Sequence, residues 1–406
     1  MTAPATVVQA KLGGGFQTLT SSTTAVEITR GRSGQIFESI DAGLATWRLN
    51  NEDRTFDPTY VDGVYYEQMR PGKSTEVRIT SGGVRIYTGM LGDLDVDYEI
   101  TGRTVTTFHC EDDLALLGRQ EFNEWTATAS QAAGARLAAV IARSEVNTLG
   151  SQSFDDGVSS LQGDLVSWGS NVLNYCQLVA RSDLGFFFVA RDGTVTFRDR
   201  HTLVDGVVQM IFTDGTAVLQ DEDGATITTE AGDPIYVEGT PFHGVETSVG
   251  SELYYNRVGI DREGGTVQTA TNTTNGATDG FRSLTQSGLL LDSDAQSLSM
   301  ASFLLARYDE PETRVSSILV KLEGLTSDQQ TSVLSLDIAD LVLVAFTPNG
   351  VGDPVEKFCL VQGVSHSIAP SMHHVTLTFG DFQRYTVFTI DHPTFGEVDA
   401  GNVVGF

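Results

Sequence analysis

Alternation of apolar and polar residues is the main pattern along this chain. Residues 84–87 alternate apolar and polar positions, and residues 375–379 do the same with Val, Leu and Phe between threonines. A period of two is typical of strands with one face buried and one face wet. Asn-Gly and Asp-Gly pairs recur between such segments, and these pairs tolerate the positive φ of tight hairpins. The pattern predicts a mainly β protein, with its clearest hairpin at residues 186–198 turning at Asp192-Gly193.

Helical periodicity is confined to three segments. The first is expected from Ser130, as the capping residue, to about Arg143; the second covers about residues 167–181, and the third about residues 294–308. Apolar residues recur every three or four positions in each segment, which indicates one buried face per helix. The residues expected on these faces are Ala133, Leu137, Val140 and Ile141, then Trp168, Val172, Cys176 and Val179, then Leu298, Ala301, Leu305 and Tyr308.

These elements predict an architecture of two β-barrel-like domains that flank a small helical domain. We expect an N-terminal β domain at residues 1–118 and an α+β insert with two helices and a hairpin at residues 119–204. A second β domain with one helix is expected at residues 205–390, and residues 391–406 lack periodicity and are expected to form an extended tail. A chain of 406 residues is long enough for several domains.

The net charge of the chain argues against some classes of function. The chain has 53 acidic and 25 basic residues, for a formal net charge of −28. A protein that binds nucleic acid without sequence preference neutralises phosphates with Lys and Arg, and no basic run is present here. An acidic chain is also repelled by anionic lipids, and no apolar stretch is long enough to span a bilayer. We therefore expect neither a stable DNA complex nor stable membrane binding. The N-terminus lacks the pattern of a signal peptide, which predicts synthesis in a cytoplasm.

The sequence contains no recognisable catalytic motif. Nucleophile elbows, zinc-protease motifs and phosphate-binding loops are missing. Residues 363–367 begin like a nucleophile elbow but lack its closing Gly, and His373 and His374 should point to opposite faces of a strand. We expect no enzyme activity and no cofactor. Glycan cleavage needs only two carboxylates and leaves no local motif, so a cell-wall hydrolase stays open as an alternative.

Three aspartates alternate with apolar residues in one predicted strand. Asp93, Asp95 and Asp97 should share one face, and Leu94, Val96 and Tyr98 should face the core of the barrel. Like charges two residues apart repel each other unless water, a cation or a basic partner faces them. Three interpretations remain: a wet outer face, the acidic lining of a channel, or a Ca²⁺ site completed by another loop.

One segment carries a family resemblance. Residues 45–58 read ATWRLNNEDRTFDP, a strand followed by a turn with Asn51, Asp53, Phe56 and Pro58, and Arg70-Pro71-Gly72 follows. This order is similar to that of the tail-hub group of minor tail proteins of siphophages that infect actinobacteria. Later blocks agree with it: the strand end at residues 87–92, the hairpin at residues 185–199, and the helix ending at Pro311 before residues 336–340. In the last block Ala339 stands where the family usually has Gly.

The resemblance implies a structural role. It implies a homotrimeric baseplate hub at the distal end of a long non-contractile tail in the virion, where three copies of two barrel-like domains continue the tail tube. It also implies the distal tail protein, the tape measure protein and receptor-binding or fibre proteins as neighbours, with DNA present only in transit. A protein that binds a host receptor or glycan is the remaining alternative, although Trp47, Trp125 and Trp168 are scattered along the sequence.

Overall fold

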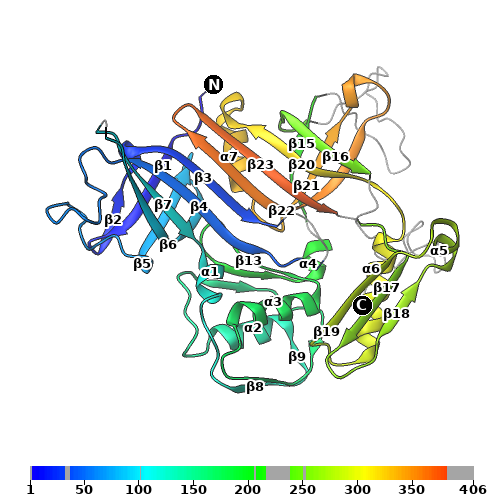
Figure 1. Ribbon diagram of the computed structural model, residues 1–406. Coiled ribbons are helices and arrows are strands. Elements are labelled where there is room, and N and C mark those ends of the chain that lie inside the picture. The colour runs from blue at the N-terminus through cyan, green and yellow to red at the C-terminus, as the bar shows by residue number, and fades with distance from the viewer. Residues whose placement is uncertain are drawn as a thin grey trace.

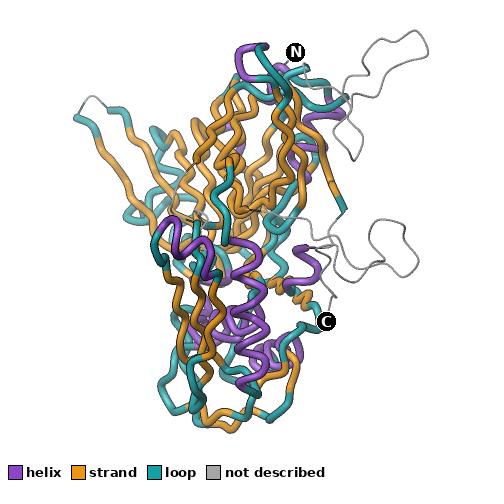
Figure 2. Tube along the Cα trace, turned by 90° about the vertical axis from the view of Figure 1, so that its right-hand side faces the viewer, coloured by secondary structure: helices purple, strands orange, loops and turns teal. Residues whose placement is uncertain are grey.

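The computed structural model describes residues 2–32, 37–100, 102–204, 207–215, 238–249 and 253–381. Its main feature is one sheet of 13 strands, in the order β16-β20-β23-β22-β3-β4-β7-β6-β5-β1-β2, to which β21 is added beside β22 and β15 beside β21. This sheet crosses the upper part of Figure 1, and in the perpendicular view of Figure 2 helices gather mainly in the lower part. The prediction of a mainly β protein with few helices is confirmed.

The N-terminal β unit supplies seven strands of the sheet. They are β1 (Thr6–Leu12), β2 (Gly15–Thr18), β3 (Thr23–Gly31), β4 (Asp41–Asn50), β5 (Gly72–Ser81), β6 (Val84–Tyr98) and β7 (Thr104–Glu111), with a 3₁₀ turn η1 at Thr20–Ser22. Their inward residues alternate with outward ones, as in β4, where every second residue is buried.

The C-terminal β unit supplies the other six strands. They are β15 (Val208–Thr213), β16 (Gly244–Val249), β20 (Thr313–Lys321), β21 (Leu341–Phe346), β22 (Val355–Ala369) and β23 (Met372–Asp381), with η2 (Leu322–Gly324), α7 (Ser327–Ser335) and η3 (Pro348–Gly350) between them. The two β units meet where β22 pairs with β3, from Gly363 opposite Gly31 to Ile368 opposite Val26. Because one apolar core runs beneath both units, they are packed as a single body.

The inserted unit lies below the sheet in Figure 1 and has its own core. It contains α1 (Asp113–Leu117), β8 (Trp125–Ala127), β9 (Gln131–Ala132), α2 (Ala133–Ile141), β10 (Gln152–Phe154), β11 (Ser160–Leu161), β12 (Asp164–Val166), α3 (Val172–Asp183), β13 (Phe186–Val189), β14 (Val195–Arg198) and α4 (Arg200–Val204). The predicted hairpin is confirmed: Phe186 pairs with Arg198, and Gly193 turns with a φ of 94°.

Two of the predicted helix starts are wrong. Ser130 does not cap a helix, because its φ is 53° and its hydroxyl donates to Asp292; α2 begins at Ala133 instead. The second helix begins at Val172, where the side chain of Asn171 accepts the backbone N–H of Asn174. Trp168 therefore precedes the helix, and its side chain is 74% exposed rather than buried.

A small α/β unit interrupts the C-terminal β unit. It contains β17 (Arg257–Arg262), β18 (Gln268–Thr271), α5 (Thr273–Asp279), β19 (Ser283–Leu289) and α6 (Asp294–Tyr308). The predicted bounds of α6 are confirmed, but Leu298 on it is exposed. Helix α6 packs on β17 and β18 around a third apolar core, so this unit is separate from the larger sheet. No sequence pattern separates this unit from the 205–390 region, whose domain bounds stay a prediction. Residues 391–406 lie outside the described residues.

Candidate functional site: an acidic hairpin and a buried junction

The three aspartates of the predicted stripe lie on the projecting half of a hairpin. Strand β6 pairs with β5 only as far as Leu91, and beyond that residue its described partner is β7. Asp93, Asp95 and Asp97 are exposed on one face, and Leu94 is partly buried against the core. The expectation for Tyr98 is wrong: its side chain is 55% exposed, because the hairpin has by then passed the edge of the apolar core.

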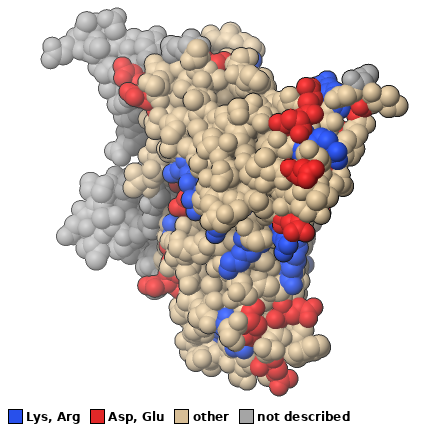
Figure 3. All heavy atoms as spheres, turned by 90° about the vertical axis from the view of Figure 1, so that its left-hand side faces the viewer, with Lys and Arg blue, Asp and Glu red and all other residues tan. Residues whose placement is uncertain are grey.

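The carboxylates of the stripe have few partners. Asp95 lies 3.0 Å from Nε2 of His109 on β7, and both side chains are well exposed. Acidic and basic side chains occur side by side on the face of the molecule drawn in Figure 3. Among the described residues, no group of three His, Cys, Asp or Glu side chains is arranged to hold a metal ion. The structure gives the Ca²⁺ interpretation no support, and the position of the stripe relative to a channel stays a prediction.

The turn with the family resemblance packs against the apolar core of the N-terminal β unit. Asn51 is fully buried; its amide donates to Thr106 at 2.8 Å, and its Oδ1 accepts the backbone N–H of Phe56 at 2.8 Å. The ring of Phe56 stacks on Tyr65 and meets Phe108 edge to face. The motif therefore serves to hold the loop against the core.

The other residues of this motif are exposed or shape the backbone. Asp53 only accepts the N–H of Thr55, and Pro58, Arg70 and Pro71 are exposed. Gly72 starts β5 with a φ of 103°, a conformation that strains any residue with a Cβ.

Asp57, which the sequence analysis did not single out, is fully buried in the same turn. Its carboxylate accepts hydrogen bonds from the backbone and hydroxyl of Thr59 and from Nε of Arg54 at 2.7 Å. Burial by itself raises the pKa of Asp57, but the hydrogen bonds from Thr59 and Arg54 outweigh it and lower the pKa to about 2. The charged carboxylate thus ties the turn together.

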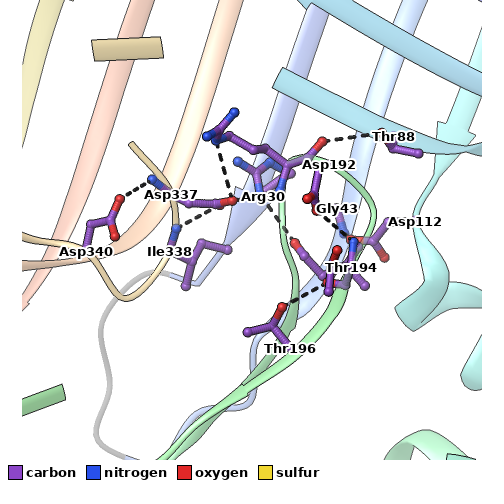
Figure 4. A network of polar contacts seen from close by, with 12 residues as sticks. Arg30, Gly43, Thr88, Asp112, Asp192, Thr194, Thr196, Asp337, Ile338 and Asp340 are labelled. Atoms are coloured by element: carbon purple, nitrogen blue, oxygen red, sulfur yellow. Dashed lines mark hydrogen bonds and ion pairs between the residues drawn. The ribbon is translucent and has the colours of Figure 1, made fainter. Parts of the chain in front are cut away.

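A buried junction joins the two β units to the inserted unit (Figure 4). Arg30 on β3 is 3% exposed; its Nη1 donates to Oδ1 of Asp337 at 2.7 Å and to the carbonyl of Val189 on β13 at 3.3 Å. Oδ2 of Asp337 accepts the backbone N–H of Arg191 at 2.7 Å. One ion pair therefore touches a strand of the N-terminal β unit, a turn of the C-terminal β unit and the hairpin of the inserted unit.

The turn that carries Asp337 enters the sheet where β22 changes its neighbour. Residues Val355 to Leu360 of β22 pair with β21, and residues Gly363 to Ile368 pair with β3. Between them, Val361 bonds to the turn: its carbonyl accepts the N–H of Ala339, and its N–H donates to the carbonyl of Asp340. Ala339 has a φ of 76°, a left-handed conformation that glycine adopts more readily than a residue with a Cβ.

A second buried carboxyl adjoins this junction. Asp112 caps α1: one oxygen accepts the N–H of Leu114 and the other accepts the N–H of Gly43 on β4. Burial raises the pKa of Asp112 to about 7, although both hydrogen bonds and Arg30 favour the charged form. No local sequence pattern marks Arg30, Asp112 and Asp337, and Arg30 and Asp337 lie 307 positions apart.

No helix in the described portion of the chain is long and apolar enough to cross a membrane. The sequence matches no family model and no curated protein. Its fold, however, is similar to that of two tail proteins over nearly the whole length. The tail protein from Neisseria meningitidis MC58 is 11% identical, with a TM-score of 0.59 over 92% of this chain and 96% of that one. The 43 kDa tail protein of prophage MuSo2 from Shewanella oneidensis is 12% identical, with a TM-score of 0.55 over 93% of this chain and 97% of that one. At this identity the likeness establishes a shared fold.

Proposed function

We propose that this protein is a structural hub of a phage tail, located at the distal end of the tail tube in the virion. The observation that carries the proposal is the near full-length match of its fold to two tail proteins, one of them from a prophage, in which almost nothing of either chain is left over. A fold alone does not define a function, but here the sequence motifs point to the same class of protein. The tail is of the long, non-contractile siphophage type in this proposal, as the sequence resemblance implies.

The hub is proposed to be a homotrimer. Three copies, each with two β units, would form a ring with six similar β units around an axial channel. Strands β2 and β16 stand at the ends of the sheet, and within the described residues each pairs on one edge only. An unpaired strand edge can be covered by a neighbouring copy, and a closed ring would cover both edges in every copy. The acidic character of the chain suits a channel through which DNA passes without binding.

In this proposal the neighbours are the distal tail protein, the tape measure protein and receptor-binding or fibre proteins. The chain holds them in place and performs no chemistry. Native mass spectrometry of the purified protein, alone and with the distal tail protein, tests the assembly: a mass of three chains is expected. A monomer in otherwise intact tail tips, or a closed ring of five or more copies, would refute the trimer.

Binding to a host glycan or receptor is the second candidate. One observation favours it: Trp168 and Leu165 are both exposed on the inserted unit, and exposed aromatic side chains are common anchors in binding surfaces. Adsorption of tails to host cells separates the two roles. Trp168→Ala should leave adsorption unchanged if the protein is only a hub, whereas a loss of adsorption with an intact trimer would favour the receptor-binding role.

A further inference from the structure

Two histidine side chains meet in the core where the two β units join. His366 on β22 and His373 on β23 are 3% and 0% exposed, and Nδ1 of His366 lies 3.1 Å from Nε2 of His373. Nδ1 of His373 lies 3.1 Å from Oγ of Ser81, the last residue of β5 in the N-terminal β unit. The backbone of His366 also pairs with Ile28 on β3. The pair therefore lies between strands of both units.

The hydrogen bonds give each histidine one proton. The hydroxyl of Thr6 on β1 donates to Ser81 at 3.3 Å, so Ser81 is free to donate its own proton to Nδ1 of His373. His373 then carries its proton on Nε2 and donates it to Nδ1 of His366. In this arrangement Thr6, Ser81 and His373 each donate to the next member of the chain while both rings are neutral. A proton added at Nδ1 of His373 deprives the Ser81 hydroxyl of its acceptor inside the core.

Of the described charged groups that act on the two rings, Glu323 alone favours an added proton. Arg30 on β3 and the ring of His374 on β23 oppose it, and the groups from β1 and β5 are the hydroxyls of Thr6 and Ser81. Glu323 on η2 is bound to the ring of His374 at 3.0 Å and reaches His373 only at its backbone N–H.

The pKa values of the two rings follow from these surroundings. Burial lowers the pKa of His366 well below its usual value, and His373 and Arg30 add to this effect. Burial also lowers the pKa of His373, to about 4, against the attraction of Glu323. Both rings are therefore neutral at pH 7.

The residues next to Ser81 also hold the N-terminal arm, which is residues 2–5. The carbonyl of Ala5 accepts the N–H of Gly82, directly after Ser81, and the amide of Gln330 on α7 donates to the carbonyl of Thr2 at 3.0 Å. Thr6 begins β1 opposite Ser81. A change at Ser81 thus reaches the arm, β5 and the β22–β23 hairpin together.

We propose that His366 and His373 form a proton-operated joint between the two β units. At neutral pH the uncharged pair holds the β22–β23 hairpin against β5 and the N-terminal arm. In acid a proton enters the pair and the hairpin separates from β5 and the arm, while the rest of the sheet stays paired. The joint is independent of the proposed role in a phage tail, since it follows from contacts within one chain.

The folding equilibrium provides the first test. Urea unfolding of the full chain is measured between pH 7 and pH 4.5 for the wild type and for the His366→Asn/His373→Gln double variant, whose amides keep hydrogen-bonding groups near the same positions but do not titrate. The folded pKa lies below the unfolded value of about 6.5, so the unfolded state binds more protons and stability is lost as pH falls. Relative to the double variant, the folding constant of the wild type should fall up to about tenfold per pH unit for each histidine.

Comparison with the double variant removes the effect of buried carboxyls. The pKa values of Asp112, Asp183 and Asp340 are raised, mainly by burial, and these groups favour the folded state at low pH in both proteins. His201→Gln is the matched control, because His201 is exposed on α4. It should follow the wild type at every pH. Parallel curves for the wild type and the double variant would overturn the proposal.

Hydrogen exchange provides the second test, because it locates the opening. At pH 4.5, after correction for intrinsic rates, the amides of residues 363–368 and 6–10 should exchange faster in the wild type than those of β4 and β7, and the double variant should lack this difference. Uniform acceleration over the whole sheet in the wild type would refute a local joint. If the double variant fails to fold, the single variant His373→Gln replaces it. This variant should remove about half of the pH dependence of the folding constant on a logarithmic scale.

Discussion

Two groups of aspartates in this molecule differ in almost every physical respect. Asp337 is enclosed at the junction of three units, where its oxygens accept hydrogen bonds from Arg30, Arg191 and Ile338. Asp93, Asp95 and Asp97 are exposed on the projecting part of β6, and Asp95 lies 3.0 Å from Nε2 of His109. We therefore expect the first carboxylate to stabilise the fold strongly and the stripe to contribute little to its stability.

The comparison separates what a sequence pattern can reveal from what it cannot. A stripe of charges at alternate positions is visible in the sequence, because strand geometry brings those residues to one face. A buried ion pair between distant segments leaves no such pattern. The two groups also respond differently to substitution, because an unpaired charge costs several kcal/mol when buried and little when hydrated.

Asp337→Ala should have the largest effect on stability. The substitution leaves the guanidinium of Arg30 buried with the carbonyl of Val189, and it removes the acceptor of two backbone N–H groups. Loss of one partner of a buried pair costs about 3–5 kcal/mol of unfolding free energy. Urea unfolding measures this loss. Asp53→Ala is the control, because exposed Asp53 accepts one backbone N–H, and its loss should cost about 1 kcal/mol or less. Equal losses of unfolding free energy in the two variants would show that the buried and the exposed carboxylate do not differ in their contribution to stability.

Asp112→Asn should show an effect that depends on pH. The folded pKa of Asp112 is raised to about 7, so the stability that the neutral carboxyl provides is present in acid and lost as pH rises through 7. Asn does not titrate, and it replaces only one of the two oxygen acceptors. The wild type should therefore exceed the variant in stability at pH 5, and the difference should shrink by roughly 1–3 kcal/mol at pH 8. A difference that is constant with pH would show that Asp112 does not titrate in this range.

Local patterns in the sequence predicted the elements whose signals are local. The bounds of α6 and the hairpin at Asp192-Gly193 were predicted correctly, because helical and hairpin signals each extend over a few residues. The predicted start of α3 is too early. Trp168 fits the apolar period, but Gly169 has a φ of 80°, which is not helical, and the helix begins only after its capping residue Asn171.

Contacts between distant segments could not be predicted. The pairing of β22 with β3 joins residues more than 330 positions apart, and no periodicity records it. The His366–His373 pair was also missed. Adjacent His373 and His374 were judged correctly to face apart, but the partner across the hairpin becomes visible only when the register is known. The small α/β unit could not be separated from the larger β region either, because the strand pairings that divide them are not visible in the sequence.

Ala339→Gly should stabilise the turn that carries Asp337. Ala339 has a φ of 76°, where a Cβ costs about 1 kcal/mol or more, and Gly removes this strain. The lost methyl contact and the greater freedom of the unfolded chain offset part of the gain, so we expect an increase of about 0.5–1 kcal/mol in unfolding free energy. Ala138→Gly on the exposed side of α2 is the matched control and should destabilise by about 1 kcal/mol. The same sign for both changes would contradict the strain at Ala339.

The triple change Asp93→Asn, Asp95→Asn and Asp97→Asn should have the smallest effect on folding. The three side chains are exposed, and surface charges of this kind contribute only about 0.5 kcal/mol or less each. Relief of repulsion between like charges and loss of the Asp95–His109 contact act in opposite directions, so the net change in unfolding free energy should be near zero.

If the stripe lines the channel of an assembled ring, however, removal of three charges per copy weakens the repulsion of DNA, and ejection from phage that carry the variant should slow. Lys11→Gln, a change of charge on β1 in the same β unit, controls for surface charge in general. Slower ejection in the triple variant alone would support the channel position, whereas unchanged ejection together with unchanged stability would leave the stripe as a hydrated outer surface.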